Sequence, residues 1–461
     1  DRIEFVGHGY PHPVDQIVDA GRAIISPGFI DLDALADIDH AILDTWVSAE
    51  IGLGLQWSAD YFRERRHDLF SREEEAFKHR YALSQLALNG VTTFMPIAGE
   101  QYKRWCETYE EFGDVVTIVE ELGLRAYLGP SYRSGVNVVH EDGRRDVLFD
   151  EAEGERGLQE AIRFVETFDG AADGRVTGCL LPARIETVTP DLLRQTRAAA
   201  ERLGCLIRLH CLQSETEARL LQQFYGKSAI QLLQELDLLN PQVLIPHAIY
   251  LQQERPDPQT PSELETFAAS GAPVIHCPLV FARAGQALHS FRRYQELGIT
   301  LALGSDTFPP DMIRVMETGL LAGNLAEGRQ DAHQAAAMFR AATLGGSRAL
   351  GREDLGRLAA GAKADIVIID LSDYRLGPIE DPIRTLVLMG NGRNIRDVIV
   401  DGRTIVKDGQ IPGLDVADMQ RQARDYFARM RAAYPERDFK RRSVDTLFPP
   451  SFRSISKPAN P

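Results

Sequence analysis

Short apolar runs that end in polar, chemically active residues recur along the chain. The first, residues 26–40 (SPGFIDLDALADIDH), begins with apolar residues around a Pro-Gly pair and ends in acidic residues and a histidine. Later runs end at His210, His247 and Asp306, and another carries His276. This pattern is typical of buried parallel strands that present polar side chains at their carboxyl ends. It predicts one functional site assembled from the ends of several strands.

Segments with helical periodicity separate these apolar runs. From about residue 24 to residue 350 the chain reads as eight strand–helix units with short connections. Such alternation favours a parallel sheet, and eight units in this length favour a closed (β/α)8, or TIM, barrel. Because all strand ends of a barrel share one face, Asp33 and Asp306 can meet there. Residues 141–158, which are acidic and rich in glycine, are expected to form a mobile loop.

The character of the sequence changes near residue 358, where β-branched residues become frequent and Asp401-Gly402 indicates a hairpin. We expect these strands to pair with the first residues of the chain in a small β-sandwich domain formed from both chain ends. An amphipathic helix and an irregular tail follow. The predicted division is 1–25 for the first part of the β-sandwich, 26–357 for the catalytic barrel, 358–413 for the second part of the β-sandwich, and 414–461 for the C-terminal helix and tail.

Composition limits the partners that this chain can have. Its 461 residues carry a net charge of −16 without a long basic run, which argues against nucleic acid as a partner. No apolar stretch reaches the roughly 18 residues that a membrane-spanning helix needs, and no signal peptide is recognisable. The five cysteines lack a CxxC spacing, which favours a reducing cytoplasm and argues against a cysteine-type zinc site. We therefore expect a cytoplasmic protein that acts on a small molecule.

The strand-end residues match the needs of a divalent metal ion. Such an ion binds neutral imidazoles and carboxylates at about 2.0–2.2 Å. We expect His210 and Asp306 to be ligands, with Asp33 and His247 completing or flanking the set. The alternative for His247 is a catalytic role, in which it orients the substituent on the attacked carbon. Asp306 is also the expected general base, which takes a proton from a water molecule. His276 is assigned a supporting catalytic role, in which it holds Asp306 or the substrate.

Candidate substrate-binding residues lie in the connections that follow the strands, because long loops over a barrel mouth commonly build the pocket. Gln213, one helical turn beyond His210, can donate and accept hydrogen bonds but cannot shuttle a proton. For the aromatic residues around Trp57, a small core beneath a loop is the alternative interpretation. The candidates for the pocket are Gln213, Trp57, Tyr132, Arg133 and Arg283.

An ordered set of motifs resembles the amidohydrolase superfamily. The set comprises SPGFIDL, GVTT, LIRLH, VLIPHAIYL, VIHCP, LALGSD, AATLGGSRALG, GRLAAGAKADIVIID and VIVDGR, and it spans about residues 2–413. It is most similar to the branch that holds cytosine, guanine and chlorotriazine deaminases and hydrolases. The resemblance implies a homodimer and one divalent metal ion, with zinc first and iron, manganese or cobalt as alternatives. It also implies attack of a metal-activated water on a carbon that carries a nitrogen or halide leaving group.

Three positions depart from the motifs of that superfamily. Its first strand usually ends with two metal-binding histidines, where this chain has Asp33 and Leu35. Its fifth strand is usually followed by a glutamate that protonates a ring nitrogen, where this chain has Gln213. Leu279 and Val280 replace part of its usual HCPxSN motif. The loss of the glutamate weakens an assignment as a purine or pyrimidine deaminase.

An altered first motif also occurs in the branches that hold phenylurea and molinate hydrolases, which this sequence resembles. We therefore predict hydrolysis of a non-peptide C–N bond of the amide, urea or carbamate type, with Asp306 as base. The alternatives are a deaminase of a heteroaromatic ring such as a purine, pterin or triazine, and a metal-free barrel that acts as a binding protein. Asp37, Asp39 and His40 stay open as replacements for the missing histidine ligands.

Overall fold

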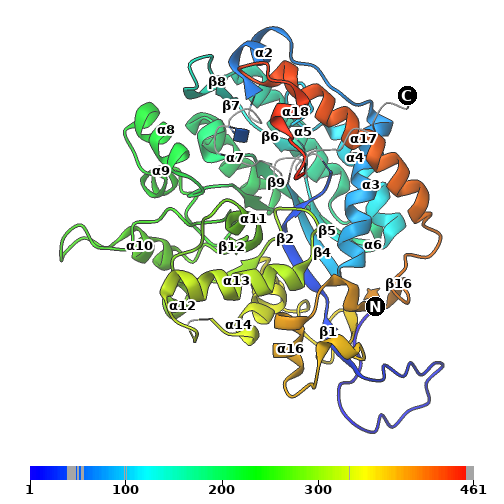
Figure 1. The fold of residues 1–461 in the computed structure, drawn as a ribbon. Helices are drawn as coiled ribbons and strands as arrows, with labels where there is room; N and C mark the ends of the chain where they lie inside the picture. The colour runs from blue at the N-terminus through cyan, green and yellow to red at the C-terminus, as the bar shows by residue number, and fades with distance from the viewer. Residues whose placement is uncertain are drawn as a thin grey trace, which may run out of the picture.

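Eight parallel strands form the central sheet of the computed structural model (Figure 1). The backbone N–H of Asp306, beyond the last of these strands, donates to the carbonyl of Asp33 on the first at 2.8 Å and links the two ends of the sheet. The sheet is therefore nearly closed, which confirms the predicted (β/α)8 barrel. In spatial order the strands are β13 (Leu301–Leu303), β12 (Val274–His276), β11 (Val243–Pro246), β10 (Leu206–Arg208), β9 (Val176–Pro182), β5 (Arg125–Leu128), β4 (Val91–Ile97) and β2 (Phe29–Leu35).

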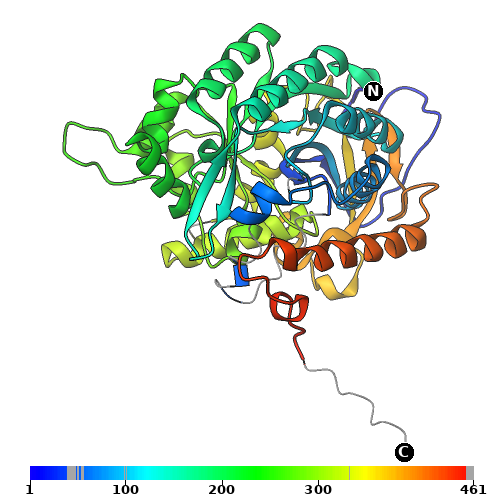
Figure 2. The same cartoon turned by 90° about the horizontal axis from the view of Figure 1, so that it is seen from above.

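Helices cover the outside of the barrel, as the view from above shows (Figure 2). Ser71 caps the first long one and exchanges hydrogen bonds with Glu74, as the spacing of these two residues predicts. Each helix lays an apolar face on the sheet, and together they build one continuous core layer. The main helices between strands are α3 (Arg72–Leu88), α4 (Tyr109–Leu122), α5 (Glu151–Phe168), α7 (Pro190–Leu203), α8 (Glu215–Tyr225), α10 (Glu263–Ser270) and α13 (Met312–Glu327).

Two apolar layers lie on opposite sides of the barrel wall. Side chains such as Ile30 and Ile275 pack together inside the barrel, while their sequence neighbours Phe29 and Val274 belong to the layer beneath the helices. Consecutive residues of a strand point to opposite faces. A shift of one position along a strand therefore decides whether a side chain enters the barrel. The structure describes residues 1–38, 48, 51–52, 57–97, 99, 101–331 and 333–452.

A four-stranded antiparallel sheet joins segments from both ends of the chain. In it β1 (Ala23–Pro27) pairs with β14 (Ile366–Asp370), which continues to β15 (Ile395–Val400) and β16 (Arg403–Val406). It is a single sheet, where the sequence predicts the two layers of a β-sandwich. The Arg125 guanidinium, buried on β5 of the barrel, binds two carboxylates of this sheet region at 2.8–3.1 Å. The barrel and the terminal sheet are thus joined by charge as well as by apolar packing.

Residues 141–158 do not form the loop that the sequence predicts. The antiparallel strands β7 (Gly135–Val139) and β8 (Arg145–Phe149) form a hairpin there, and α5 begins at Glu151. Asp150 caps that helix by accepting a hydrogen bond from the Glu153 backbone at 3.2 Å. Many of the charged residues in this stretch are exposed on regular elements. Their acidity indicated a solvated surface rather than an absence of structure.

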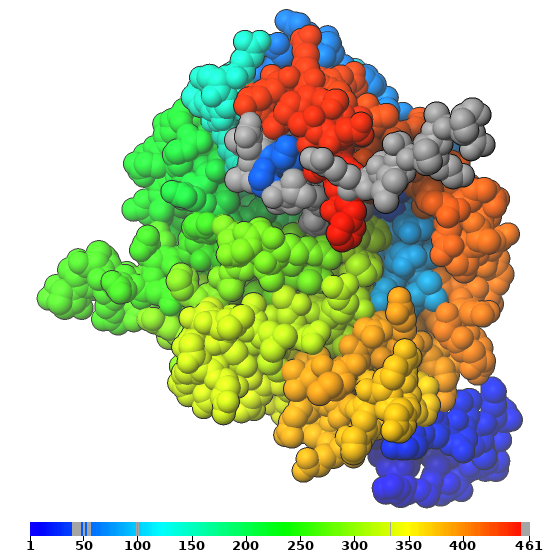
Figure 3. Space-filling view, in the orientation of Figure 1, coloured from blue at the N-terminus to red at the C-terminus, as the bar shows by residue number. Residues whose placement is uncertain are grey.

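The C-terminal segment packs on the barrel beside residues 57–71, the described end of the first connection, which joins β2 to α3 (Figure 3). In it α17 (Val416–Arg437) lies beside α3, where the ring of Tyr426 stacks on that of Phe77 at 4.8 Å. The short helix α18 (Val444–Leu447) follows, and Leu447 is buried in one apolar cluster with Tyr102 and Tyr434. None of the described helices is long and apolar enough to cross a lipid bilayer.

Candidate active site

Four of the predicted site residues meet where the barrel strands end. Asp33 lies near the end of β2, and His210, His247 and Asp306 follow β10, β11 and β13. The Nε2 atom of His210 is 3.3 Å from Oδ1 of Asp33, and the Nε2 atom of His247 is 3.9 Å from Oδ2 of the same carboxylate. His247 Nε2 is also 3.8 Å from Oδ2 of Asp306. Barrel closure therefore gathers side chains that are far apart in the sequence.

His210 is oriented by the segment that follows the neighbouring strand. Its Nδ1 atom lies 2.8 Å from the carbonyl oxygen of Ala183, so in the neutral imidazole Nδ1 carries the proton and donates it. The Nε2 atom then presents a lone pair toward the Asp33 carboxylate, at 3.3 Å. Two ligand atoms on one tetrahedral metal ion are separated by a similar ~3.4 Å, given bonds of about 2.1 Å.

His247 is fully buried, yet neither of its ring nitrogens has a hydrogen-bond partner among the residues that the structure describes. Leaving a buried polar group unsatisfied costs about 1–3 kcal/mol. Its backbone φ is +75°, and the next residue, Ala248, has a φ of +49°. Such left-handed conformations cost of order 1–3 kcal/mol in residues other than glycine and cluster at functional sites. An orphaned imidazole on a strained strand end is the arrangement expected where an ion or substrate binds.

Burial and a fixed charge set the protonation of this cluster. Removal from water lowers the pKa of His210 and of His247, because it penalises the imidazolium form. Burial alone would raise the pKa of Asp33, but His210, the Arg208 guanidinium and His247 hold it well below its usual range. Of these three neighbours, Arg208 is the one whose positive charge is permanent. Neutral imidazoles and ionised carboxylates are the forms that bind metal ions.

Arg208 is a buried partner of Asp33 that the sequence did not single out. It lies on β10 and is only 1% exposed. Its Nη1 atom donates to Oδ1 of Asp33 at 3.2 Å and also to the carbonyl oxygen of Pro96. The signal available in the sequence was an arginine inside the apolar run LIRLH, two positions before His210 and hence on the same strand face. Arginine is rarely buried without a partner, so a buried arginine at this position predicts a carboxylate in contact with it.

Asp306 is the more accessible of the two carboxylates. Its side chain is 15% exposed, whereas that of Asp33 is 0% exposed. The preceding residue, Ser305, donates from its backbone and hydroxyl to Asp31 at 3.0 and 2.6 Å. These bonds pin the loop after β13 to β2, with Asp306 at a φ of +46°. Burial raises the pKa of Asp31 to about 6.

The residues present fit a divalent metal ion. Ligand atoms of Asp33, His247, Cys277 and Asp306 all lie within 4.8 Å of one another. The 3.8–3.9 Å that separate His247 from the two carboxylates are too long for hydrogen bonds and somewhat longer than the ~3.4 Å between ligands of a tetrahedral ion. Cys277, which directly follows β12, was not among the predicted site residues. Nitrogen, oxygen and sulfur donors together are a set that suits zinc.

His276 lies on the other side of the barrel wall. Its ring is 5.8 Å from that of Phe291, and it lines a small cavity with His333. Because its neighbour Cys277 points into the barrel, strand alternation turns His276 outward. Burial lowers the pKa of His276 to about 3. The structure therefore does not bring this histidine to Asp306, and the residue one position later faces the site instead.

Three predicted pocket residues also lie in packed regions. Trp57 is buried in a small apolar cluster, with the Arg437 guanidinium 4.7 Å from its ring, which matches the alternative interpretation of a core beneath a loop. Tyr132 is fully buried, and its hydroxyl hydrogen-bonds that of Thr196 at 2.8 Å. Arg133 is buried and donates to a backbone carbonyl of the preceding connection at 2.5 Å. None of the three side chains is part of the strand-end cluster, which consists of Asp33, His210, His247 and Asp306.

Gln213 and Arg283 lie beside the strand-end cluster. Their hydrogen bonds to residues near the cluster show this position. Arg184, which follows β9 and was not predicted, donates to Oε1 of Gln213. In addition to burial, the Arg184 charge lowers the pKa of both site histidines. Arg283 hydrogen-bonds the Thr307 hydroxyl and the carbonyl of Phe308, the two residues that follow the catalytic aspartate candidate. These side chains therefore border the site through the loops after β9, β10, β12 and β13.

A second buried cluster contains potential metal ligands but is neutralised by lysines. Ligand atoms of Glu75, His79 and Glu111 also lie within 4.8 Å of one another. Glu75 binds the ammonium groups of Lys78 and Lys103 at 2.7 and 3.1 Å, and Glu111 binds His79 and Lys103 at 2.9 and 2.6 Å. Two ammonium groups in contact with two carboxylates make this an ion-pair network that joins α3, α4 and the segment before α4.

Asp37 belongs with this network rather than with the strand-end cluster. Against the effect of burial, the hydrogen bond and charge of Glu111, followed by the charge of Asp37, raise the pKa of His79 to about 9. The Nδ1 atom of His79 also hydrogen-bonds the carbonyl oxygen of Ala36 at 2.7 Å. Asp39 and His40, the other alternative ligands, lie outside the described residues.

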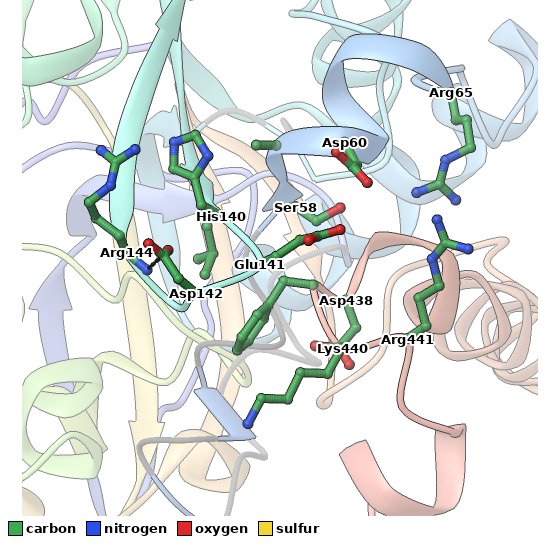
Figure 4. Close-up of a pocket in the computed structure, with 13 residues that line it drawn as sticks. Ser58, Asp60, Arg65, His140, Glu141, Asp142, Arg144, Asp438, Lys440 and Arg441 are labelled. Carbon is green, nitrogen blue, oxygen red and sulfur yellow. Dashed lines mark hydrogen bonds between the residues drawn. The ribbon is translucent and has the colours of Figure 1, made fainter.

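A surface pocket of about 580 Å³ lies apart from these residues (Figure 4). Its wall combines Ser58 and Asp60 from the first connection with the turn of the β7–β8 hairpin and the segment after α17. The lining carries both positive and negative side chains. Because none of the four cluster residues lines it, this pocket is not evidence for where the reaction occurs.

Relatives of known name cover almost the whole chain. It is 27% identical over 434 residues to a 5-methylthioadenosine/S-adenosylhomocysteine deaminase of Halobacterium salinarum, which spans 92% of this chain and 90% of that protein. It is 25% identical over 444 residues to a 5′-deoxyadenosine deaminase of Methanosarcina mazei, covering 93% and 92%.

Solved structures share the fold at lower identity. A zinc complex of atrazine chlorohydrolase from Arthrobacter aurescens superposes with a TM-score of 0.73, at 19% identity, over 93% of this chain and 94% of that one. A zinc-bound adenosine deaminase from Xanthomonas campestris gives a TM-score of 0.70, at 18% identity, over 89% and 87%. The model of the family described as "Amidohydrolase family" matches residues 24–405, which include the barrel strands and the strand-end cluster. The chain therefore belongs to the amidohydrolase family, and it is a hydrolase of C–N bonds other than peptide bonds.

Proposed function

We propose that this chain is a metal-dependent deaminase of a heteroaromatic ring, with adenosine-like nucleosides as its first candidate substrates. Relatives named as deaminases of such nucleosides, which match over about nine-tenths of both chains, support this choice over amides, ureas and carbamates. The observation that carries the proposal is the cluster of Asp33, His210, His247 and Asp306 at the strand ends.

These four residues are proposed to hold a divalent ion, with zinc first. Zinc is present in the solved atrazine chlorohydrolase and adenosine deaminase structures that share the fold. When bound, such an ion supplies a Lewis acid that lowers the pKa of a water molecule. The neutral imidazoles and the ionised Asp33 are already in their metal-binding forms, so little rearrangement of protons is needed.

Asp306 is proposed to act as the general base. Its carboxylate belongs to the cluster and is partly accessible to solvent. The carboxylate of Asp33, in contrast, is fully buried against Arg208 and His210. Asp306 can therefore accept a proton from the attacking water and pass it to the departing nitrogen. The Nε2 atom of His247 faces both carboxylates and is its proposed ligand atom, and the alternative role of this residue is to orient the group on the attacked carbon.

A second candidate is hydrolysis of an amide, urea or carbamate, and it rests on Gln213. This amide accepts a hydrogen bond from Arg184 and cannot deliver a proton to a ring nitrogen. Attack on a carbonyl carbon makes no such demand, because the developing charge falls on oxygen and can be stabilised by a cation such as Arg184. The two candidates therefore differ in whether the substrate needs a proton on its ring.

A substrate panel separates the two candidates. Zinc-loaded protein is incubated with 5′-deoxyadenosine, a pterin, an aminotriazine, a phenylurea and a thiocarbamate, and ammonia release and product masses are followed. Deamination of the nucleoside with a kcat/KM well above that for the urea is expected. Turnover of the urea or carbamate alone would replace the first proposal with the second.

The remaining proposals concern metal dependence and assembly. If purified protein holds far less than one equivalent of metal and Asp306→Asn changes neither binding nor turnover, the barrel is a metal-free binding protein instead. A homodimer and a cytoplasmic location also remain proposals, and light scattering in solution tests the first of them.

A further inference from the structure

Cys277 faces the strand-end cluster from inside the barrel. It follows β12 directly and packs in the same inner layer as Ile275. Its Sγ atom lies 3.5 Å from Oδ2 of Asp33 and belongs with Asp33, His247 and Asp306 to the group whose ligand atoms all lie within 4.8 Å. The thiol therefore sits among the residues that are proposed to hold the ion.

The two oxygens of Asp33 face different sides of the site. Oδ1 is bound by Arg208 at 3.2 Å and lies 3.3 Å from His210. Oδ2 faces Cys277 at 3.5 Å and His247 at 3.9 Å. The Arg208 guanidinium already binds Oδ1, and His210 approaches the carboxylate from that same side, so Oδ2 is the oxygen of Asp33 that faces both the thiol and His247. An ion at Oδ2 has the thiol as an immediate neighbour.

A glycine makes room for this contact. A Cβ atom at Gly304, just after β13, would lie 2.5 Å from Cβ of Asp33 and 3.0 Å from Sγ of Cys277. Any other residue at this position would push the two side chains aside. The strand end is therefore built so that the carboxylate and the thiol can approach each other.

The cluster also contains an unsatisfied group and a missing donor. Within the described part of the chain, both ring nitrogens of His247 are buried without a hydrogen-bond partner, and one of them faces Oδ2 of Asp33 at 3.9 Å. Leu35, one of the two positions that usually supply a histidine, is buried and apolar and offers no ligand atom. The thiolate of Cys277 can replace the ligand that a histidine at position 35 would supply.

We propose that the Cys277 thiolate is a direct ligand of the divalent ion and takes the coordination position that Leu35 cannot supply. The inference rests on the proposed function, since it names one ligand of the same ion. On binding, a metal–sulfur bond forms and the thiol proton is released to solvent. A sulfur donor shifts the preference of the site toward zinc and cadmium and away from manganese. This assignment differs from the expectation that cysteines play no part in a metal site.

Cobalt substitution tests the assignment without relying on activity. Full-length protein is freed of metal with a chelator and titrated with Co²⁺, and its absorption is recorded from the near ultraviolet to the visible. One equivalent of bound Co²⁺ should give a thiolate-to-cobalt charge-transfer band. Cys277→Ser should abolish the band. Cys179→Ser is the matched control, because Cys179 is also a buried thiol of the inner layer but lies outside the cluster, and it should leave the band unchanged.

Affinity gives a second readout. Cys277→Ser should weaken cadmium binding by at least about 100-fold. Loss of a residue that only hydrogen-bonds a metal ligand lowers metal affinity by up to about 100-fold, and loss of a direct ligand should lower it at least as much. Manganese binding should change far less. If Cys277→Ser fails to fold, as circular dichroism would reveal, the wild-type cobalt spectrum decides the question alone.

The outcomes distinguish this inference from the function on which it rests. One equivalent of bound Co²⁺ without a charge-transfer band in the wild type overturns the cysteine ligand and leaves the metal-dependent function standing. A charge-transfer band that persists in Cys277→Ser also overturns it. Failure of the protein to bind any of the three metal ions overturns the inference together with the metal-dependent function.

Discussion

Asp33 connects a buried ion pair to the candidate metal position through its two carboxylate oxygens. Its carboxylate is fully buried, with Arg208 and His210 at one oxygen and Cys277 and His247 at the other. Arg208 keeps the group ionised and holds its orientation. The second oxygen is thereby presented to the candidate metal position. A neutral histidine at position 33 would need no such partner, whereas a buried carboxylate does.

Arg208→Met is expected to lower the free energy of unfolding by about 3–5 kcal/mol, because it leaves the buried Asp33 carboxylate unpaired. Arg208→Lys should lose less, since it retains the charge but not the planar hydrogen-bonding group. Urea denaturation with chelator present measures both without a contribution from bound metal. A loss of less than ~1 kcal/mol for the methionine variant, typical of exposed pairs, would contradict this role.

Asp306→Asn is expected to reduce kcat by about 10²–10⁴-fold, the usual contribution of a positioned general base. The amide cannot accept the proton, while the backbone bond to Asp33 that positions residue 306 is unaffected. Steady-state kinetics on the best substrate of the panel measure the effect. Glu296→Gln, an exposed change on the outer surface, serves as the control and should leave kcat unaltered. An Asp306→Asn enzyme with wild-type kcat would remove this residue from the mechanism.

At the scale of elements, the register of one strand decides which residue of β12 reaches the site. The run PVIHCP places a histidine next to a cysteine, and alternation allows only one of them to enter the barrel. Ile275 and Cys277 point inward, so His276 packs outward against Phe291. The apolar pattern of such a short, doubly buried strand does not reveal its inner face, because both faces are apolar. This explains why the sequence led to the wrong neighbour.

The ion-pair network between α3 and α4 predicts a dependence of stability on pH. His79 has a pKa of about 9 in the folded state against 6.5 ordinarily, so its stabilisation is complete below pH 6.5 and is lost as pH rises through 9. The difference in unfolding free energy between wild type and His79→Gln should therefore shrink by about 3 kcal/mol over this range. Urea unfolding from pH 6 to 9.5 measures it. His289→Gln, at an exposed position, is the control, and a pH-independent gap for His79→Gln would contradict the assignment.

At the scale of the whole molecule, Arg125 couples the barrel to the sheet formed from both chain ends. It lies on β5 and binds Asp365 and Asp401, which flank β14 and β15. Arg125→Met should lower the free energy of unfolding by about 3–5 kcal/mol, because the buried Asp365 carboxylate loses its guanidinium partner, whereas Asp401 keeps Lys363 at 3.0 Å. Arg72→Met, which breaks an exposed pair with Asp114, should cost at most ~1 kcal/mol. Equal losses in the two variants would show that Arg125 does not join the two parts.

The alternation of apolar runs and helical segments determined the barrel, because strand and helix periodicities are local properties of the chain. The same runs determined that Asp33, His210, His247 and Asp306 lie at strand ends, and a closed parallel barrel places all such ends on one face. The roles of residues in the connections between strands and helices did not follow from local patterns. Trp57, Tyr132 and Arg133 pack in cores whose partners come from distant segments, and no local pattern distinguishes such a residue from one that lines a pocket.

Only the tertiary structure decided which buried charged residues pair with each other. It also decided which residues of each short strand face the inside of the barrel. The contacts of Arg208 with Asp33, and of Cys277 with the same carboxylate, join residues on different strands whose distance depends on barrel closure. Electrostatic and coordination contacts act over a few ångströms in space, irrespective of separation along the chain. The sequence by itself therefore determined which chemical groups the barrel presents, and the fold determined which of them touch.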